Sequence, residues 1–169
     1  MKITPVLFHR RGNAVSSTIR LGTDSYWNHC GWCFTDSEGV EMFSEAVEFG
    51  VILITKENML KKYSLICEIR YLPEVETDVE YKNHLGDRYD FSIFGSQGAF
   101  YFSKKLFGVD SFITKKISNK DIENAWFCFE WLGYMCKKEY YWNLTGRDFS
   151  PLNRKGQVII TPTNSYKQL

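Results

Sequence analysis

The 169-residue sequence has no apolar run that approaches the roughly 18 residues needed to cross a membrane. The apolar run near its start is also too short for a secretion signal. These two absences exclude the pattern of an integral membrane protein and that of a signal-bearing secreted one. We therefore predict no integral membrane segment and a cytoplasmic location.

An excess of charge of one sign is also missing. The chain has 21 lysines and arginines against 20 aspartates and glutamates, which gives a formal net charge of +1. Nucleic acids and anionic membranes attract proteins through an excess of positive charge, so this balance argues against both as partners. The basic residues that occur in adjacent pairs are expected to be solvated surface side chains.

The sequence lacks a second pair of closely spaced metal-binding residues to accompany Cys30-Gly-Trp-Cys33. A zinc site would need two more ligands, and a thioredoxin-like redox pair would lead into a helix rather than into Phe34 and a turn. We expect two core thiols in a strand, no metal and no organic cofactor. The count of five cysteines is odd, which together with the missing secretion signal predicts that all of them are reduced thiols.

Hydrophobic residues make up 44% of the chain and aromatic residues 17%, a composition typical of a globular protein. At this length we predict a single domain over residues 1–169. The expected strands are 6–8, 50–54, 65–72 and 158–161, together with a β-hairpin over 28–48.

Two helices are predicted from capping signals. Thr55 is suited to cap a helix that runs to Lys62, and Thr77 begins a capping-box spacing that Gly86 would close. Residues 15–21 fit either a short helix or an extended segment, and residues 91–107 fit a mixture of loop and helix. Short strands and helices without regular alternation predict an α+β fold.

The segment 126–135 places Cys128 within an aromatic pattern typical of a helix. A thiol near a helix N-terminus has a lowered pKa, which makes the thiolate nucleophile available. Ser118 or Asn124 would each serve as the N-cap. We favour Asn124, because a start at Ser118 would put Cys128 in the third turn, beyond the reach of the helix dipole.

A thiolate nucleophile needs a base and an orienting group, and His29 with a glutamate fits both roles. Within a hairpin over 28–48, the strand register decides which carboxylate shares the face of His29. If the numbers of residues that face each other across the hairpin sum to 74 or 76, Glu45 shares the face of His29. If they sum to 75, Glu48 does. The turn residues leave both registers open.

His9 and His84 have polar neighbours and are expected at the surface.

These segments together resemble the permuted papain-like cysteine hydrolases related to the NlpC amidases, in which the histidine precedes the cysteine. The resemblance covers about residues 15 to 155 and rests on the order of five short motifs. They are Thr23-x-Ser25-x-Trp27-x-His29, Glu45-Ala46 followed by Gly50-Val51, Gly86-x-x-Tyr89-Asp90, Trp126-Phe127-Cys128-Phe129-Glu130, and Phe149-Ser150-Pro151. The chain departs from the family at Phe129, where a serine is frequent.

The resemblance implies a papain-like fold, with an antiparallel sheet or open barrel packed against the cysteine-bearing helix. It selects Glu45 over Glu48 and assigns no role to Tyr89 and Asp90. It further implies that a peptide, amide or acyl ester is cleaved through an acyl-enzyme on Cys128, whose backbone N–H donates to the oxyanion. Two other functions stay open: an acyltransferase of the same fold, and a catalytically silent binding module such as a phage or bacterial accessory protein. Oligomeric state is not predicted.

Overall fold

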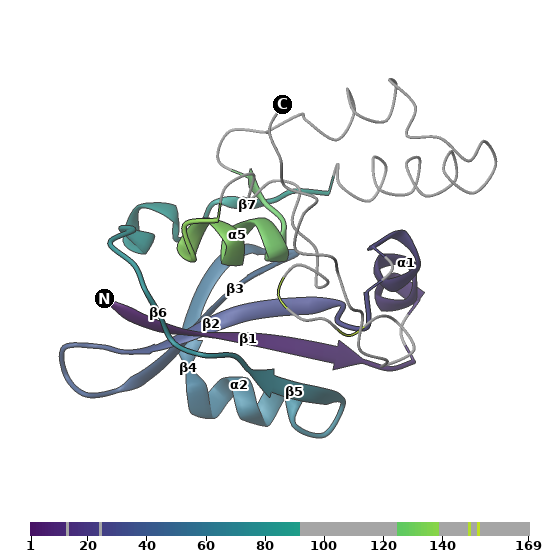
Figure 1. Ribbon diagram of the computed structural model, residues 1–169, viewed down its shortest axis with the longest axis horizontal. Helices are drawn as coiled ribbons and strands as arrows, with labels where there is room; N and C mark the ends of the chain where they lie inside the picture. Colours follow the sequence, from purple (N-terminus) through teal and green to yellow (C-terminus); the bar gives the residue numbers. More distant parts are fainter. Residues whose placement is uncertain (13, 24, 92–124, 139–148, 150–151, 153–169) are drawn as a thin grey trace.

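The centre of the molecule is a six-stranded antiparallel sheet (Figure 1). The computed structural model describes residues 1–12, 14–23, 25–91, 125–138, 149 and 152. The strands are β1 Lys2–Arg10, β2 His29–Thr35, β3 Glu41–Val47, β4 Gly50–Thr55, β5 Cys67–Tyr71 and β6 Val75–Glu76. Their order is β4-β3-β2-β1-β5, and β6 pairs with β1.

Short helices and a separate strand pair accompany this sheet in the part of the chain that the structure describes. The helices there are α1 Ala14–Thr23, α2 Lys56–Tyr63, the 3-10 helix Tyr81–His84, and α5 Cys128–Met135. The strands β7 Arg88–Tyr89 and β8 Ala125–Trp126 pair in parallel directly before α5. The fold class is therefore α+β, as the sequence predicts. No helix within the described residues is both long enough and apolar enough to span a membrane.

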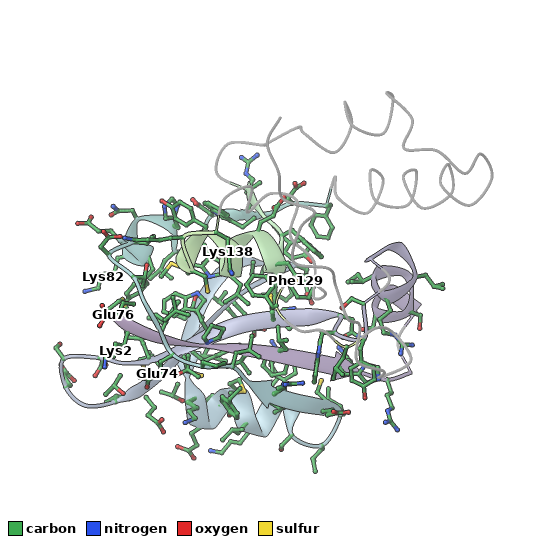
Figure 2. The ribbon with its side chains drawn as sticks, in the orientation of Figure 1. Lys2, Glu74, Glu76, Lys82, Phe129 and Lys138 are labelled. Carbon is green, nitrogen blue, oxygen red and sulfur yellow. The ribbon has the colours of Figure 1, made fainter. Side chains whose placement is uncertain are left out.

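The two faces of the sheet are covered by different helices, with α5 on one side and α2 on the other (Figure 1). Alternate residues of each strand point to opposite faces. Thus Cys30 and Trp32 of β2 pack in the core beneath α5, whereas Cys33 packs with α2. Side chains fill the layer between α5 and the sheet, where the ring of Phe129 is fully buried (Figure 2).

The predicted hairpin over 28–48 is confirmed, and its register is fixed. Asp36 holds the turn because its Oδ1 accepts the backbone N–H groups of Glu38 and Val40, at 2.9 and 2.8 Å. Cys33 then pairs with Phe43, so the numbers of the paired residues sum to 76. This register puts Glu45, and not Glu48, on the face of His29.

Most other predicted elements in the described residues are confirmed. Strands are present at 6–8 and 50–54, and β5 covers Cys67–Tyr71 of the predicted 65–72. Residues 15–21, which the sequence left open, belong to α1. The Thr55 hydroxyl caps α2 by accepting the N–H of Asn58 at 3.2 Å. The predicted strand 158–161 and nearly all of 91–107 lie outside the described residues.

The helix predicted to begin at Thr77 is wrong. The backbone N–H of Thr77 instead donates to Met1 O at 2.8 Å, which keeps this segment extended beside β1. The helical turn begins only at Tyr81 and is of the 3-10 type. Gly86 nevertheless follows this turn with φ of +87°, the left-handed conformation expected of a closing glycine.

The start of α5 lies later than the sequence predicted. Ser118 and Asn124 lie outside the described residues, but residues 125–126 form β8, so the N-cap is Phe127. The side chain of Glu130 accepts the Phe127 N–H at 2.9 Å and so supplies the cap that Phe127 cannot. Cys128 is therefore the first residue of the helix.

Candidate active site

Cys128 is held at the positive end of α5 and is only 1% exposed. The strand β8 leads directly into it, and β2 lies beneath it. The Cys30 Sγ–H donates to the carbonyl oxygen of Cys128 at 3.0 Å, and the Cys30 backbone hydrogen bonds to the Cys128 sulfur. The thiol is thus fixed between the helix start and the central sheet.

His29 is the first residue of β2, and its Nε2 lies 2.5 Å from Oε2 of Glu45 on β3. The His29 side chain is 18% exposed, while that of Glu45 has no exposure. The imidazole also interacts with the side chain of Cys128. Because Nε2 is engaged by Glu45, Nδ1 is the nitrogen left to face the sulfur.

Glu45 has two further partners, both from the last turn of α2. Lys62 Nζ donates to Oε1 at 2.9 Å, and the Tyr63 hydroxyl donates to Oε2 at 2.6 Å. Every oxygen of this buried carboxylate is therefore hydrogen-bonded, as the burial of a charge requires.

The pKa values of the three groups favour their charged forms. Burial alone would raise the pKa of Cys128, but hydrogen bonds from Cys30 and His29 and attraction to the imidazolium lower it to about 6. Burial would lower the pKa of His29, but its interactions with Cys128 and Glu45 raise it to about 10. For Glu45, burial is outweighed mainly by His29, and the pKa falls to about 2. Between about pH 6 and 10 the site therefore holds a thiolate, an imidazolium and a carboxylate.

The other four cysteines differ from Cys128. All five are free thiols, but burial raises the pKa of Cys30, Cys33, Cys67 and Cys136, to about 11 in the case of Cys33 and Cys136. Cys128 is thus the single thiol in the chain that the structure equips to ionise near neutral pH. Cys30 and Cys33 are buried in β2, as expected of core thiols.

The predicted Tyr89 and Asp90 lie beside the segment that leads into Cys128. Tyr89 pairs with Trp126 in the β7–β8 ladder, and its ring centroid is 6.1 Å from that of Phe127. Burial and then the nearby Cys128 charge raise the pKa of Tyr89. Asp90 is buried, and its N–H donates to Trp126 O at 3.1 Å.

Glu48 is exposed in the turn between β3 and β4, beyond the end of the strand that carries Glu45. The structure does not bring it to His29. The last motif of the resemblance is Phe149-Ser150-Pro151, of which only Phe149 belongs to the described residues. The centroid of its ring lies 6.2 Å from that of Phe129.

The expectation that His9 and His84 lie at the surface is wrong. His9 is 3% exposed, stacks on Tyr26 and donates from Nδ1 to the Tyr26 carbonyl at 2.6 Å. His84 is partly buried, with Nδ1 2.9 Å from Asp87 Oδ2 and its ring edge-on to Trp126. Tertiary neighbours bury both histidines, although polar residues flank them in the sequence.

Sequence reasoning missed Lys62 and Tyr63. The position of α2 along the chain could have indicated them. Thr55 fixes the start of α2, and an eight-residue helix then ends at Tyr63, which lies on the same buried face as Met59.

Within the described residues, no group of three or more histidine, cysteine, aspartate or glutamate side chains is arranged to hold a metal ion.

Compared with known proteins, the sequence matches no family model and no curated protein.

Proposed function

We propose that this protein is a thiol hydrolase of the permuted papain-like type, with Cys128 as nucleophile, His29 as general acid and base, and Glu45 as the orienting carboxylate. The observation that carries the proposal is the convergence of one low-pKa thiol, at a helix start, with a buried imidazole–carboxylate pair. Perturbed pKa values that cluster in this way are typical of active sites.

In the proposed reaction, the Cys128 thiolate attacks the carbonyl carbon of an amide, peptide or acyl ester. The oxyanion accepts a hydrogen bond from the Cys128 N–H, since a first-turn amide has no partner within its own helix. His29 then donates its proton to the leaving amine or alcohol, and an acyl-enzyme forms. Water, deprotonated by His29, cleaves this thioester and restores the thiolate.

Glu45 has a supporting part in this scheme. A carboxylate on Nε2 keeps the proton on that nitrogen, so Nδ1 faces the thiol and exchanges the proton during the reaction. The same carboxylate stabilises the imidazolium while the thiolate is waiting for substrate. The proposal requires no metal and no organic cofactor.

Thiol labelling tests the proposal without a known substrate. A limiting dose of iodoacetamide at pH 6.5 should alkylate Cys128 before the other four cysteines, because its pKa is about 6 and theirs are raised. Peptide mass spectrometry identifies the modified residue. The variant His29→Ala should slow the labelling, since the thiolate then loses its counter-ion.

Faster labelling of Cys30 or Cys136 in the folded protein would overturn the choice of nucleophile. Equal, slow labelling of all five thiols would instead favour a catalytically silent binding module. If Cys128 reacts first, an activity screen with amide, peptide and acyl ester substrates, with and without amine acceptors, separates hydrolysis from acyl transfer.

A further inference from the structure

The last residue of α2, Tyr63, shares a carboxylate oxygen with His29. The Tyr63 hydroxyl lies 2.6 Å from Oε2 of Glu45, and His29 Nε2 lies 2.5 Å from the same atom. Lys62 Nζ lies 2.9 Å from the other oxygen, Oε1. The orientation of the carboxylate that holds the imidazole is thus determined from the end of a helix.

The direction of the Tyr63 hydrogen bond is fixed by the charges of both partners. Burial, and then the neighbouring Glu45 charge, raise the pKa of Tyr63, so the phenol keeps its proton. Glu45, with a pKa lowered to about 2, has no proton to give near neutral pH. The phenol therefore donates, and such a bond to a charged acceptor is among the stronger kind.

The aromatic ring of Tyr63 has a separate role from its hydroxyl. The residue is 5% exposed, and its ring centroid lies 4.7 Å from that of Phe8 and 5.9 Å from that of His29. These packing contacts need the ring alone. Removal of the oxygen would leave them intact and would release only the hydrogen bond to Glu45.

The helix that carries Tyr63 is anchored at its start and at its middle. Thr55 caps its start, and Met59, with no exposed surface, packs in the same cluster as Phe43 of β3. A side chain at the end of so short and fixed a helix has little freedom to move. It is thereby suited to hold another group in place.

We propose that Tyr63 is a positioning residue of the active site, which acts through Glu45 to keep the His29 imidazole directed at Cys128. This inference rests on the proposed function. Without the hydroxyl, the carboxylate would keep Lys62 on Oε1 and His29 on Oε2, and its orientation toward Nε2 would be less restrained. The imidazolium would then stabilise the thiolate less well.

The test is the pH dependence of Cys128 alkylation by iodoacetamide, measured for the wild-type protein and for Tyr63→Phe. The wild-type rate should rise with an inflection near pH 6. In Tyr63→Phe the inflection should move up by about one pH unit, which makes alkylation at pH 6 about fivefold slower. Far-UV circular dichroism should show the wild-type fold in both proteins.

The matched control is Tyr26→Phe. The Tyr26 hydroxyl also donates to a carboxylate, that of Glu68 at 2.5 Å, but this hydrogen bond is exposed to solvent. This variant should keep the wild-type inflection, so a general effect of losing a tyrosine hydroxyl is separated from a loss at the site.

Three outcomes are decisive. An unchanged inflection in Tyr63→Phe overturns the positioning role but leaves the proposed function standing. A Tyr63→Phe protein that does not fold overturns it too, because the hydroxyl would then be needed for the structure itself. A wild-type protein with no inflection below the usual range of a thiol overturns the proposed function, whatever the variants do.

Discussion

Glu45 receives hydrogen bonds from three side chains although its own side chain has no solvent exposure. A buried, unpartnered carboxylate would bind a proton rather than stay charged. Here His29, Lys62 and Tyr63 together make the charged form the stable one. The whole site therefore depends on the permanent negative charge of Glu45 beside the His29 imidazole.

Substitution at Glu45 tests this basis directly. In Glu45→Gln the neutral amide should no longer stabilise the imidazolium, so the pKa of His29 should fall clearly below its value of about 10. Titration of the His29 ring resonances by nuclear magnetic resonance measures the change. Glu48→Gln is the matched control and should leave the titration unaltered, because Glu48 is exposed in the β3–β4 turn. A His29 titration that is the same in Glu45→Gln as in the wild type would refute the pairing.

At this scale the sequence predicts part of the site. His29 was predicted from its residue type and motif, strand alternation narrowed its partner to Glu45 or Glu48, and the resemblance favoured Glu45. The register of the hairpin places Glu45 beside His29. Tyr63 was not predictable in the same way, because its partner lies on another element and only the packing of α2 on β3 brings the two together. The same cause explains His9, whose burial depends on Tyr26 stacking on its ring.

Among the elements, β4 and the loop before β7 are joined by a close backbone approach at Gly50. This residue has φ of +109°, and a Cβ atom built on it would lie 2.4 Å from the Asp87 carbonyl oxygen. Val51 N and Gly86 N hydrogen bond across the same junction, both at 2.9 Å. Asp87 also accepts the Trp126 Nε1–H at 2.8 Å, so the junction supports β8 and the start of α5.

Gly50→Ala should therefore destabilise the protein more than Gly39→Ala does. Gly39 has a similar φ of +82° but no atom within 4 Å of its would-be Cβ, so its replacement should cost about 1–2 kcal/mol from the backbone alone. Gly50→Ala adds a clash with backbone atoms, worth roughly another 1–3 kcal/mol. Urea unfolding of both variants gives their free energies of unfolding. Equal losses in the two variants would mean that the backbone at the junction moves apart without an energetic penalty.

Elements with a complete local signal were predicted best. The cap at Thr55 and the turn after Asp36 use side chains that lie within four residues of the groups they bind. The start of α5 was missed because Phe127 has no capping atom, and Glu130 does that work from inside the helix. The helix expected after Thr77 failed because a distant partner, the backbone of Met1, holds that segment extended.

On the scale of the whole molecule, the two layers meet at the end of the sheet where β2 begins. The core beneath α5 and the core around α2 lie on opposite faces of the sheet, and the side chains of His29 and Glu45 lie on the face of α2. Because the hydrogen bonds of Glu45 join β2, β3 and α2, the charged groups of the site also contribute to the stability of the fold. That contribution depends on pH in a way that can be derived from Glu45.

The pKa of Glu45 is lowered from 4.5 to about 2, so the unfolded chain binds its proton more readily than the folded protein does. The stabilisation is fully present above pH 4.5 and is lost as the pH falls toward 2. A difference of this size corresponds to about 3 kcal/mol. Urea unfolding at a series of pH values should show that the wild type loses about this much more stability in that window than Glu45→Gln. Parallel curves for the two proteins would contradict the lowered pKa.

The order of the site residues along the chain also matters while the protein is being made. His29, Glu45 and Tyr63 all belong to the first part of the sheet and α2, whereas Cys128 follows Tyr63 by about 65 residues. At roughly 5–20 residues per second, a ribosome needs about 3 to 13 s to add that interval. The growing chain thus contains its base and carboxylate before it possesses a nucleophile. A product that is released or cut before α5 would contain His29, Glu45 and Tyr63 but no Cys128 thiol.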